Sequence, residues 1–288
     1  MSATLTLPLQ SEVAAPLCQT ARLRPAPVFR PCRDHPAAPI TATILTKDSE
    51  LLLTRVLRSL HWCDEIVVLD TGSTDRTASI ARSFANVSLH RLAAGFPGFG
   101  GARRHAVALA GNDWILSVDS DEVVSPELAA EISSLRLDSG FVYTVPFHNY
   151  YNGKRITTCG WAPDRHERLF NRKATNFCSS DVHERVQTRG MGVIRLRHPI
   201  RHYSYRSPED FLRKMGTYSR LFAEQNAGRT ASGPGKAALR SLWAFAKSYV
   251  LERGMLQGSE GLTISAYKAQ TVFWKYIMLH EANNAASQ

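Results

Sequence analysis

The segment EIVVLDTGSTDRT, residues 65–77, decides the fold that we expect for this chain. Its first half is an almost continuous β-branched and apolar run, which is typical of a strand covered on both faces of a sheet. Gly72 permits a tight turn, and Ser73 or Thr74 can cap a helix that follows. A buried strand that passes through a polar turn into a helix indicates a βαβ unit.

The same alternation continues on both sides of this segment. Strands are expected at 40–45, 65–70, 86–92 and 113–119, and helices at 49–60, 74–84 and 100–110. This order predicts an α/β domain built on a parallel sheet. Ligands bind beyond the carboxyl ends of such strands, so the residues that follow each run are the ones to examine for chemistry.

The remaining segments differ from this α/β pattern in composition and in the elements that they predict. Residues 1–39 are rich in proline, alanine and arginine and predict a disordered extension. The middle of the chain predicts hairpins and loops, and the last third predicts helices, the first of them capped by Ser207. The expected domains are an extension at 1–39, an α/β domain at 40–205 with halves 40–122 and 123–205, and a helical region at 206–288.

The composition excludes several classes of protein. A chain of 288 residues, 44% of them hydrophobic, can bury a large core without disulfide bonds. Its cysteines include no C-x-x-C pair, so free thiols in a reducing cytosol are expected. No stretch reaches the ~18 apolar residues that span a bilayer, and residues 1–39 lack the apolar core of a secretory signal. The net charge of +10 suits nucleic acid, an anionic lipid surface or a phosphorylated substrate.

Two acidic motifs follow predicted strands. Asp119-Ser120-Asp121 comes directly after an apolar run, and two carboxylates two residues apart in an extended chain point the same way. Such a pair can hold a hard divalent cation, although an isolated D-x-D is also found as a loop or helix-cap feature. Asp70, at the tip of the 65–70 run, is placed to accept a hydrogen bond from a nucleobase N–H or a ribose hydroxyl.

A glycine-rich segment, GFPGFGGARR at 95–104, precedes the predicted strand at 113–119. It matches neither the P-loop pattern nor a dinucleotide-binding pattern placed directly after a strand. Its glycines alone are typical of a flexible turn. Arg103 or Arg104 can either clamp a diphosphate or pair with one of the acids at the strand ends.

Taken in order, several segments resemble the family 2 glycosyltransferases with the GT-A fold: ILTKDSE, EIVVLDTGSTDRT, GFGGARR, WILSVDSDE, GWAPDRHERLF and DVHERV. The last two segments, with the helical tail, are similar more narrowly to lipopolysaccharide core β-1,4-glucosyltransferases of the WaaE/KdtX type. The resemblance covers residues 40–281. It implies a Rossmann-like, mostly parallel mixed sheet flanked by helices, followed by a C-terminal helical tail. One departure is Asp48-Ser49, where the family more often has Asn-Glu.

The resemblance also implies roles for single residues. Asp70 recognises the uracil of a UDP-sugar, Thr46 lies against the nucleoside, and Arg103 approaches the donor. In the D-x-D motif with Ser120, Asp119 lies toward the ribose, and Asp121 holds Mg²⁺ or Mn²⁺ between the phosphates, with Asp119 as the other candidate ligand. Neutralising the departing UDP is Lewis-acid chemistry that a divalent cation supplies.

An inverting transfer also requires a carboxylate that takes the proton of the acceptor hydroxyl. Glu184, in the VHE segment shared with the resembling enzymes, is the expected base, and Asp181 is the reserve candidate. Trp161, Asp164 and His183 are candidates for the acceptor site. The competing interpretations are core packing for the tryptophan, an arginine-paired loop for the aspartate and a structural role for the histidine.

The helical tail carries most of the excess positive charge. Between 236 and 251 one predicted helix face is apolar and another is basic. The apolar face holds Leu239, Leu242, Trp243, Ala246 and Val250, and the basic face holds Lys236, Arg240 and Lys247. Such a helix either lies on an anionic membrane surface or packs on the protein with a solvated basic face.

The expected function is an inverting hexosyltransferase that moves glucose from UDP-glucose to a heptose of the lipopolysaccharide inner core, a lipid-linked, phosphorylated acceptor. The expected location is cytoplasmic, at the inner face of the inner membrane. Another envelope polysaccharide, a glycolipid or a protein is the alternative acceptor. A sugar-phosphate nucleotidyltransferase would need a glycine-rich basic loop that ILTKDSELLL does not offer, and a nucleic-acid-binding protein would need a zinc-finger or RNP pattern. A catalytically silent scaffold is the third rival.

Overall fold

The computed structural model describes residues 38–92, 95–178 and 185–286. Nearly all of the expected extension, and the candidates Asp181, His183 and Glu184, lie outside these ranges. The chain divides into two compact units. We call the described residues of 38–148 and 164–202 the sheet unit, and those of 149–163 and 203–286 the helical unit.

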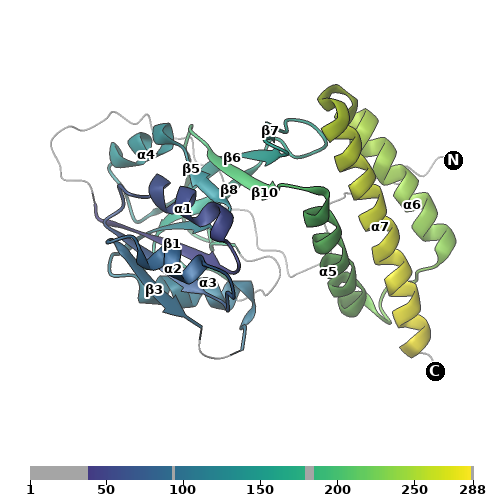
Figure 1. The fold of residues 1–288 in the computed structure, drawn as a ribbon, viewed down its shortest axis with the longest axis horizontal. Helices are drawn as coiled ribbons and strands as arrows, with labels where there is room; N and C mark the ends of the chain where they lie inside the picture. The colour runs from purple at the N-terminus through teal and green to yellow at the C-terminus, as the bar shows by residue number, and fades with distance from the viewer. Residues whose placement is uncertain (1–37, 93–94, 179–184, 287–288) are drawn as a thin grey trace. The chain divides into compact units, whose positions relative to one another are not determined.

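The first half of the sheet unit is the predicted βαβ series (Figure 1). Four parallel strands lie in the order β3-β2-β1-β4: β1 Ile40–Thr46, β2 Glu65–Asp70, β3 Val87–Arg91 and β4 Trp114–Asp119. The helices between them are α1 Glu50–Ser59, α2 Thr77–Arg82 and α3 Gly98–Leu109. Nearly every residue of β1, β2 and β4 is buried, as expected for strands covered on both faces.

The second half of the sheet is largely antiparallel. The full strand order is β3-β2-β1-β4-β8-β6-β10-β5, and β7 and β9 pair with β6. The added strands are β5 Glu122–Val124, β6 Phe141–Tyr151, β7 Lys154–Arg155, β8 Arg165–Asn171, β9 Gly192–Arg195 and β10 Ile200–Tyr205. The predicted fold class, a mixed α/β sheet flanked by helices and followed by a helical region, is confirmed.

One helix of the sheet unit was not predicted from the sequence. Helix α4, Pro126–Ser133, begins after Ser125, whose side chain accepts a hydrogen bond from the Leu128 N–H at 3.1 Å. Pro126 occupies the first turn, where its missing N–H costs nothing. The serine-proline pair is the sequence signal that was available for this helix.

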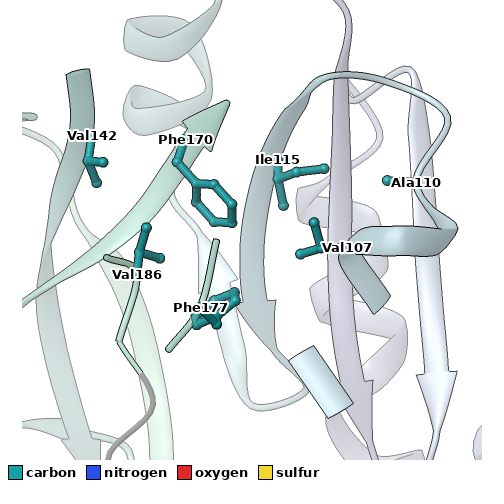
Figure 2. Packing of buried hydrophobic residues seen from close by; sticks show 7 residues of the cluster. All are labelled: Val107, Ala110, Ile115, Val142, Phe170, Phe177 and Val186. Carbon is teal, nitrogen blue, oxygen red and sulfur yellow. The ribbon is translucent and has the colours of Figure 1, made fainter. Parts of the chain in front are cut away.

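A buried apolar cluster fixes α3 against the sheet (Figure 2). It brings together seven side chains from α3, β4, β6, β8 and the loops beside them: Val107, Ala110, Ile115, Val142, Phe170, Phe177 and Val186. Burying a side chain of this size stabilises the fold by about 1.5–3 kcal/mol. Arg103 lies one helical turn before Val107, on the same face of α3, so this packing also determines where its guanidinium group lies.

The helical unit contains three long helices, α5 Pro208–Asn226, α6 Pro234–Ala246 and α7 Gly258–Ala286. Helix α7 packs along both α5 and α6 (Figure 1). A π-helical turn, Lys247–Leu251, and a 3₁₀ turn, Gly254–Gln257, join α6 to α7. Ser207 is the N-cap residue of α5, as predicted, although its side chain makes no capping hydrogen bond. In the described part of the chain, no helix is both long and apolar enough to cross a bilayer.

Candidate functional site

The carboxyl ends of three neighbouring parallel strands carry polar side chains. In the strand register Thr46 of β1 lies opposite Asp70 of β2, and Leu45 of β1 lies opposite Asp119 of β4. Because adjacent strands are about 4.8 Å apart, Asp70 and Asp119 flank the end of β1 with a separation of about 10 Å between their strands. The predicted strand-end residues are therefore brought together at one edge of the sheet.

Asp70 is held by its own turn. Its Oδ1 accepts hydrogen bonds from the N–H groups of Gly72 and Ser73, at 3.2 and 2.8 Å, and from the Ser73 hydroxyl at 2.6 Å. Gly72 has φ +112°, a conformation that side-chain-bearing residues rarely adopt. Within the described residues no hydrogen bond reaches Oδ2. The carboxylate is 3% exposed and fixed in orientation, with one oxygen left for a ligand.

Thr46 lies between the two acids and is also 3% exposed. Its backbone carbonyl accepts hydrogen bonds from the N–H and the hydroxyl of Thr71. Its own Oγ1 is buried and has no hydrogen-bond partner in the described part of the chain. An unsatisfied buried hydroxyl costs about 1–3 kcal/mol, so this group is suited to a partner that arrives with a ligand.

Asp119 is held by two arginines from other elements. Arg103 Nη2 donates to both carboxylate oxygens, at 2.7 and 3.0 Å, and Arg168 Nη2 donates to Oδ2 at 3.2 Å. Burial acts to raise the pKa of Asp119, but the charges of Arg103 and Arg168 hold it well below its usual range. Of the two roles open to Arg103, pairing with a strand-end acid is the one that the structure shows.

Arg103 is buried and braced on three sides. Its Nη1 donates to the Ser117 hydroxyl at 3.2 Å, and its guanidinium carbon lies 5.5 Å from the centre of the Phe177 ring. Phe177 belongs to the apolar cluster in Figure 2, so the core packing positions the arginine that in turn positions Asp119.

Glu122 and Arg168 were not among the predicted site residues. Glu122 is 1% exposed and accepts hydrogen bonds from Arg168 and from the Asp119 N–H. Burial raises the pKa of Glu122, and the charge of Arg168 opposes this rise. The signal available in the sequence was a third acid directly after the D-x-D motif, at the start of an apolar run.

The D-x-D motif is not an extended chain, which corrects the expectation on which the parallel direction of its two carboxylates was based. Ser120 and Asp121 form a turn between β4 and β5. Asp119 faces the arginines, whereas Asp121 Oδ1 lies 3.5 Å from His202 Nε2. The Ser120 hydroxyl is hydrogen-bonded to that of Ser49 at 2.8 Å. The chain reverses because Glu122 begins a new strand and its carboxylate binds back to the Asp119 N–H.

His202 is a further site residue that the sequence did not reveal. It lies on β10, which pairs with β5 in a register that sets His202 opposite Glu122. Burial lowers the pKa of His202, but the hydrogen bond and charge of Asp121 outweigh this and raise it. The ring also packs edge-on against Phe147, with centroids 5.7 Å apart. Only the strand pairing brings this residue, 81 positions away, to Asp121.

The donor set determines how a metal ion can be held. Across the described ranges there is no group of three or more His, Cys, Asp or Glu side chains that could bind one. Asp121 and His202 nevertheless supply one carboxylate oxygen and one imidazole nitrogen at adjacent positions. A cation held by one or two carboxylates together with substrate phosphates is the usual arrangement for Mg²⁺ in nucleotide sites, and Asp121 supplies such a carboxylate. The residues therefore fit a cation that binds together with a diphosphate.

The expected acceptor residues have local partners. Asp164 Oδ1 lies 2.9 Å from His166 Nε2, and both side chains remain partly exposed. Trp161, in the helical unit, stacks on Tyr205 with ring centroids 5.5 Å apart and packs near Phe211. Trp161 is thus part of an aromatic cluster. This is the packing role that was considered above as the alternative to stacking on a sugar. No described contact tests His183, Asp181 or Glu184.

Comparison with known proteins agrees with this architecture. The family model "Glycosyl transferase family 2" matches residues 42–196. An uncharacterized glycosyltransferase of Rickettsia typhi is 28% identical over 257 residues, covering 84% of this chain and 87% of the relative. The lipopolysaccharide core biosynthesis glycosyltransferase LpsC of Rhizobium meliloti is 26% identical over 195 residues, covering 66% and 72%.

Two solved structures are similar at lower levels. S. aureus TarS 1–349 in complex with UDP aligns with a TM-score of 0.41 and 17% identity, over 87% of this chain and 91% of that one. Glucosyl-3-phosphoglycerate synthase from Mycobacterium tuberculosis aligns with a TM-score of 0.31 and 23% identity, over 40% and 45%. At these TM-scores the likeness carries no argument about the site. The family model, by contrast, spans more than half of the 288 residues. The chain therefore belongs to glycosyl transferase family 2, and its mixed sheet flanked by helices is a GT-A fold.

Proposed function

We propose that the protein is an inverting hexosyltransferase that uses a UDP-sugar, with glucose as the hexose. The observation that carries the proposal is the row of Asp70, Thr46 and Asp119 at one sheet edge. Within this row the Thr46 hydroxyl and the Asp70 Oδ2 atom have no described protein partner. A nucleoside offers the N–H and hydroxyl groups that such atoms bind.

The donor is assigned to this row residue by residue. Asp70 accepts from the uracil N–H, the Thr46 hydroxyl contacts the nucleoside, and Asp119 faces the ribose. Arg103 acts through Asp119, because its guanidinium group is already engaged there. Ser120, tied to Ser49, holds the turn that presents the diphosphate side of the site.

Mg²⁺ or Mn²⁺ is assigned chiefly to Asp121, which lies beside His202. Asp119, the other candidate ligand, already accepts hydrogen bonds from two arginines, so it is better suited to the sugar of the nucleoside. The chemistry that a bound cation supplies here is neutralisation of the charge on the departing diphosphate. Arg168 and Arg103 keep Asp119 ionised and in place during this step.

The transfer itself needs one proton acceptor. The acceptor hydroxyl oxygen attacks the anomeric carbon from the face opposite UDP, the bond to the diphosphate breaks, and a carboxylate takes the hydroxyl proton. We assign this role to Glu184, with Asp181 in reserve, and the acceptor contacts to Asp164, His183 and Trp161. Glu184→Gln is expected to retain UDP binding and lose transfer, and unchanged turnover would move the base elsewhere.

The acceptor is proposed to be a heptose of the lipopolysaccharide inner core, modified at the cytoplasmic face of the inner membrane. The Rhizobium relative, named for lipopolysaccharide core biosynthesis, supports this class. The alternative is another envelope polysaccharide, a glycolipid or a protein acceptor. Mass analysis of lipopolysaccharide from a deletion strain distinguishes them, since only the core assignment predicts a missing hexose there.

The donor assignment is tested by titration calorimetry of the full chain with UDP, UDP-glucose and GDP-mannose, with and without Mn²⁺. We expect the uridine nucleotides to bind in preference and Mn²⁺ to tighten that binding. Asp113→Asn is a matched control, since Asp113 precedes the opposite end of β4 and pairs with Lys173. Equal affinity for GDP-mannose, or loss of UDP binding in the control as well, would contradict the assignment.

A further inference from the structure

Helix α6 turns large apolar side chains toward solvent. Leu239 and Leu242 are 71% and 70% exposed, and Trp243 is 44% exposed. Their spacing, continued by Ala246, places them on one face of the helix. The buried face that packs on α7 carries small residues instead, Ala237 and Ala244. This arrangement reverses the usual one, in which the large apolar residues of a surface helix face the core.

The apolar surface continues beyond the end of α6. We call eight exposed apolar residues on α6 and the two turns after it the apolar ridge: Leu239, Leu242, Trp243, Ala246, Val250, Leu251, Met255 and Leu256. Single exposed apolar residues are normal, but a run of this length marks an interaction surface. Figure 1 shows α6 lying along α7, and Ala237 and Ala244 of α6 are buried in one cluster with Val272 and Tyr276 of α7.

The charges around the apolar ridge are predominantly positive. Residues 234–257 contain four basic residues and one acid, and α6 itself has no acidic residue. Lys236 and Arg240 lie over the Tyr276 ring, and Arg240 also donates to the Tyr276 hydroxyl at 2.6 Å. These contacts hold two positive charges of α6 against Tyr276 of α7.

The acids near the ridge are neutralised by ion pairs. Glu252 pairs with Lys268 at 3.0 Å and lies 3.8 Å from Lys247. Glu260, at the start of α7, pairs with Lys154 at 2.8 Å. Residues 234–257 therefore combine exposed apolar side chains with a net positive charge, which suits a surface that is apolar inside and anionic at its boundary.

We propose that the apolar ridge docks the protein on an anionic phospholipid bilayer. Helix α6 would lie in the plane of the interface, with its leucines about 5–10 Å into the boundary between headgroups and acyl chains. Trp243 has the amphipathic ring that favours this depth, and the net positive charge of residues 234–257 favours anionic headgroups. This surface goes beyond the proposed transfer reaction, because none of its residues belongs to the donor site.

The test is co-sedimentation of the full chain with vesicles of 30% phosphatidylglycerol in phosphatidylcholine, and with pure phosphatidylcholine vesicles. We expect binding to the anionic vesicles, which 0.5 M NaCl weakens, and a blue shift of tryptophan emission that Trp243→Phe removes. The double variant L239Q/L242Q is expected to bind about tenfold more weakly, since two leucines no longer enter the interface. Leu51→Gln, which changes an equally exposed leucine on α1, is the matched control.

The outcomes separate the proposal from its rivals. Equal vesicle binding by the wild type and L239Q/L242Q, or equal loss in the Leu51→Gln control, would overturn it. A dimer in solution that L239Q/L242Q dissociates, without vesicle binding by the wild type, would identify a second copy as the occupant instead. UDP binding by L239Q/L242Q is expected to be unchanged, so a failure of the donor site and a failure of the ridge are distinguishable.

Discussion

Strands β2 and β4 both end in an aspartate, but the two carboxylates are held in different ways. The Asp70 carboxylate accepts all of its described hydrogen bonds from residues two and three positions along the chain. Asp119 depends on Arg103 and Arg168, which are 16 and 49 positions away. The first carboxylate is oriented by local sequence, and the second by the packing of α3 and β8. Substitutions in the two turns should therefore differ in which property they damage.

The largest effect is expected at Asp121, in the second turn. Asp121→Ala should lower the transfer rate by about a thousandfold or more, because it removes the carboxylate assigned to the cation. The fold should remain intact, since the Asp121 side chain is partly exposed. A UDP-release assay with a Mn²⁺ titration checks the rate, and circular dichroism checks the fold. Normal turnover would remove Asp121 from the site.

Arg168→Ala should cause the largest loss of stability, about 3–5 kcal/mol in the free energy of unfolding. It leaves Glu122 buried without its positive partner and removes one of the two arginines from Asp119. Adding Glu122→Gln should restore part of the loss, because the buried charge is then removed. Urea unfolding of the single and double variants measures both effects. A loss below about 1 kcal/mol, the value typical of exposed pairs, would contradict the proposed tertiary support of this turn.

Asp70→Asn tests the first turn and should affect binding more than stability. The amide keeps an oxygen for the Gly72 and Ser73 N–H groups but loses the charged acceptor proposed for uracil. We expect UDP affinity to fall about tenfold or more, as for the loss of a hydrogen bond to a charged group. Calorimetry measures the affinity, and thermal melting should shift little. A large drop in the melting temperature with unchanged affinity would reverse the two roles.

The smallest effect is expected for Ser73→Ala. Its hydroxyl donates to Asp70 and accepts from the Asp48 N–H, so the variant loses two hydrogen bonds at the edge of the site. We expect about 1 kcal/mol of destabilisation and a loss of UDP affinity of severalfold at most. The backbone N–H of Ser73 still holds Asp70, which keeps the turn closed. If Ser73→Ala matched Asp70→Asn in affinity, the hydroxyl and not the carboxylate would be the main donor contact.

The local pattern of apolar residues predicted the four parallel strands of the sheet closely. Strand β2 has the bounds that its apolar run predicts, and β1, β3 and β4 differ by only one or two residues. Helix α2 begins at Thr77 and not at residue 74. Side chains at the start of α1 and just before it accept hydrogen bonds from the backbone N–H groups that precede α2. Asp48 accepts from the Thr74 N–H at 2.8 Å, and Glu50 accepts from the Arg76 N–H at 3.1 Å. Such contacts join segments 26 positions apart, so no window of sequence contains them.

In the helical unit, too, the sequence predicts some features and only the structure shows others. The sequence separates an apolar from a basic face in 236–251, and the structure adds that the apolar face is the exposed one. Helix α7 begins at Gly258, after a turn in which the chain passes very close to itself. A Cβ at Gly261 would lie 1.9 Å from the Gly254 carbonyl oxygen, so only glycine fits there. The start of α7 is therefore linked to the close packing of Gly254 and Gly261, which the helical periodicity of the sequence does not reveal.

The sequence by itself determined the βαβ order, the strand-end positions of Thr46, Asp70 and Asp119, and the turn that orients Asp70. These depend on side-chain period and on hydrogen bonds between near neighbours, which a linear pattern records. Only the tertiary structure decided that Arg103 and Arg168 hold Asp119, that Asp121 faces His202, and that the leucines of α6 lie outward. Those contacts depend on strand pairing and helix packing between distant segments, which are selected by burial of the whole core and not by any one stretch of chain.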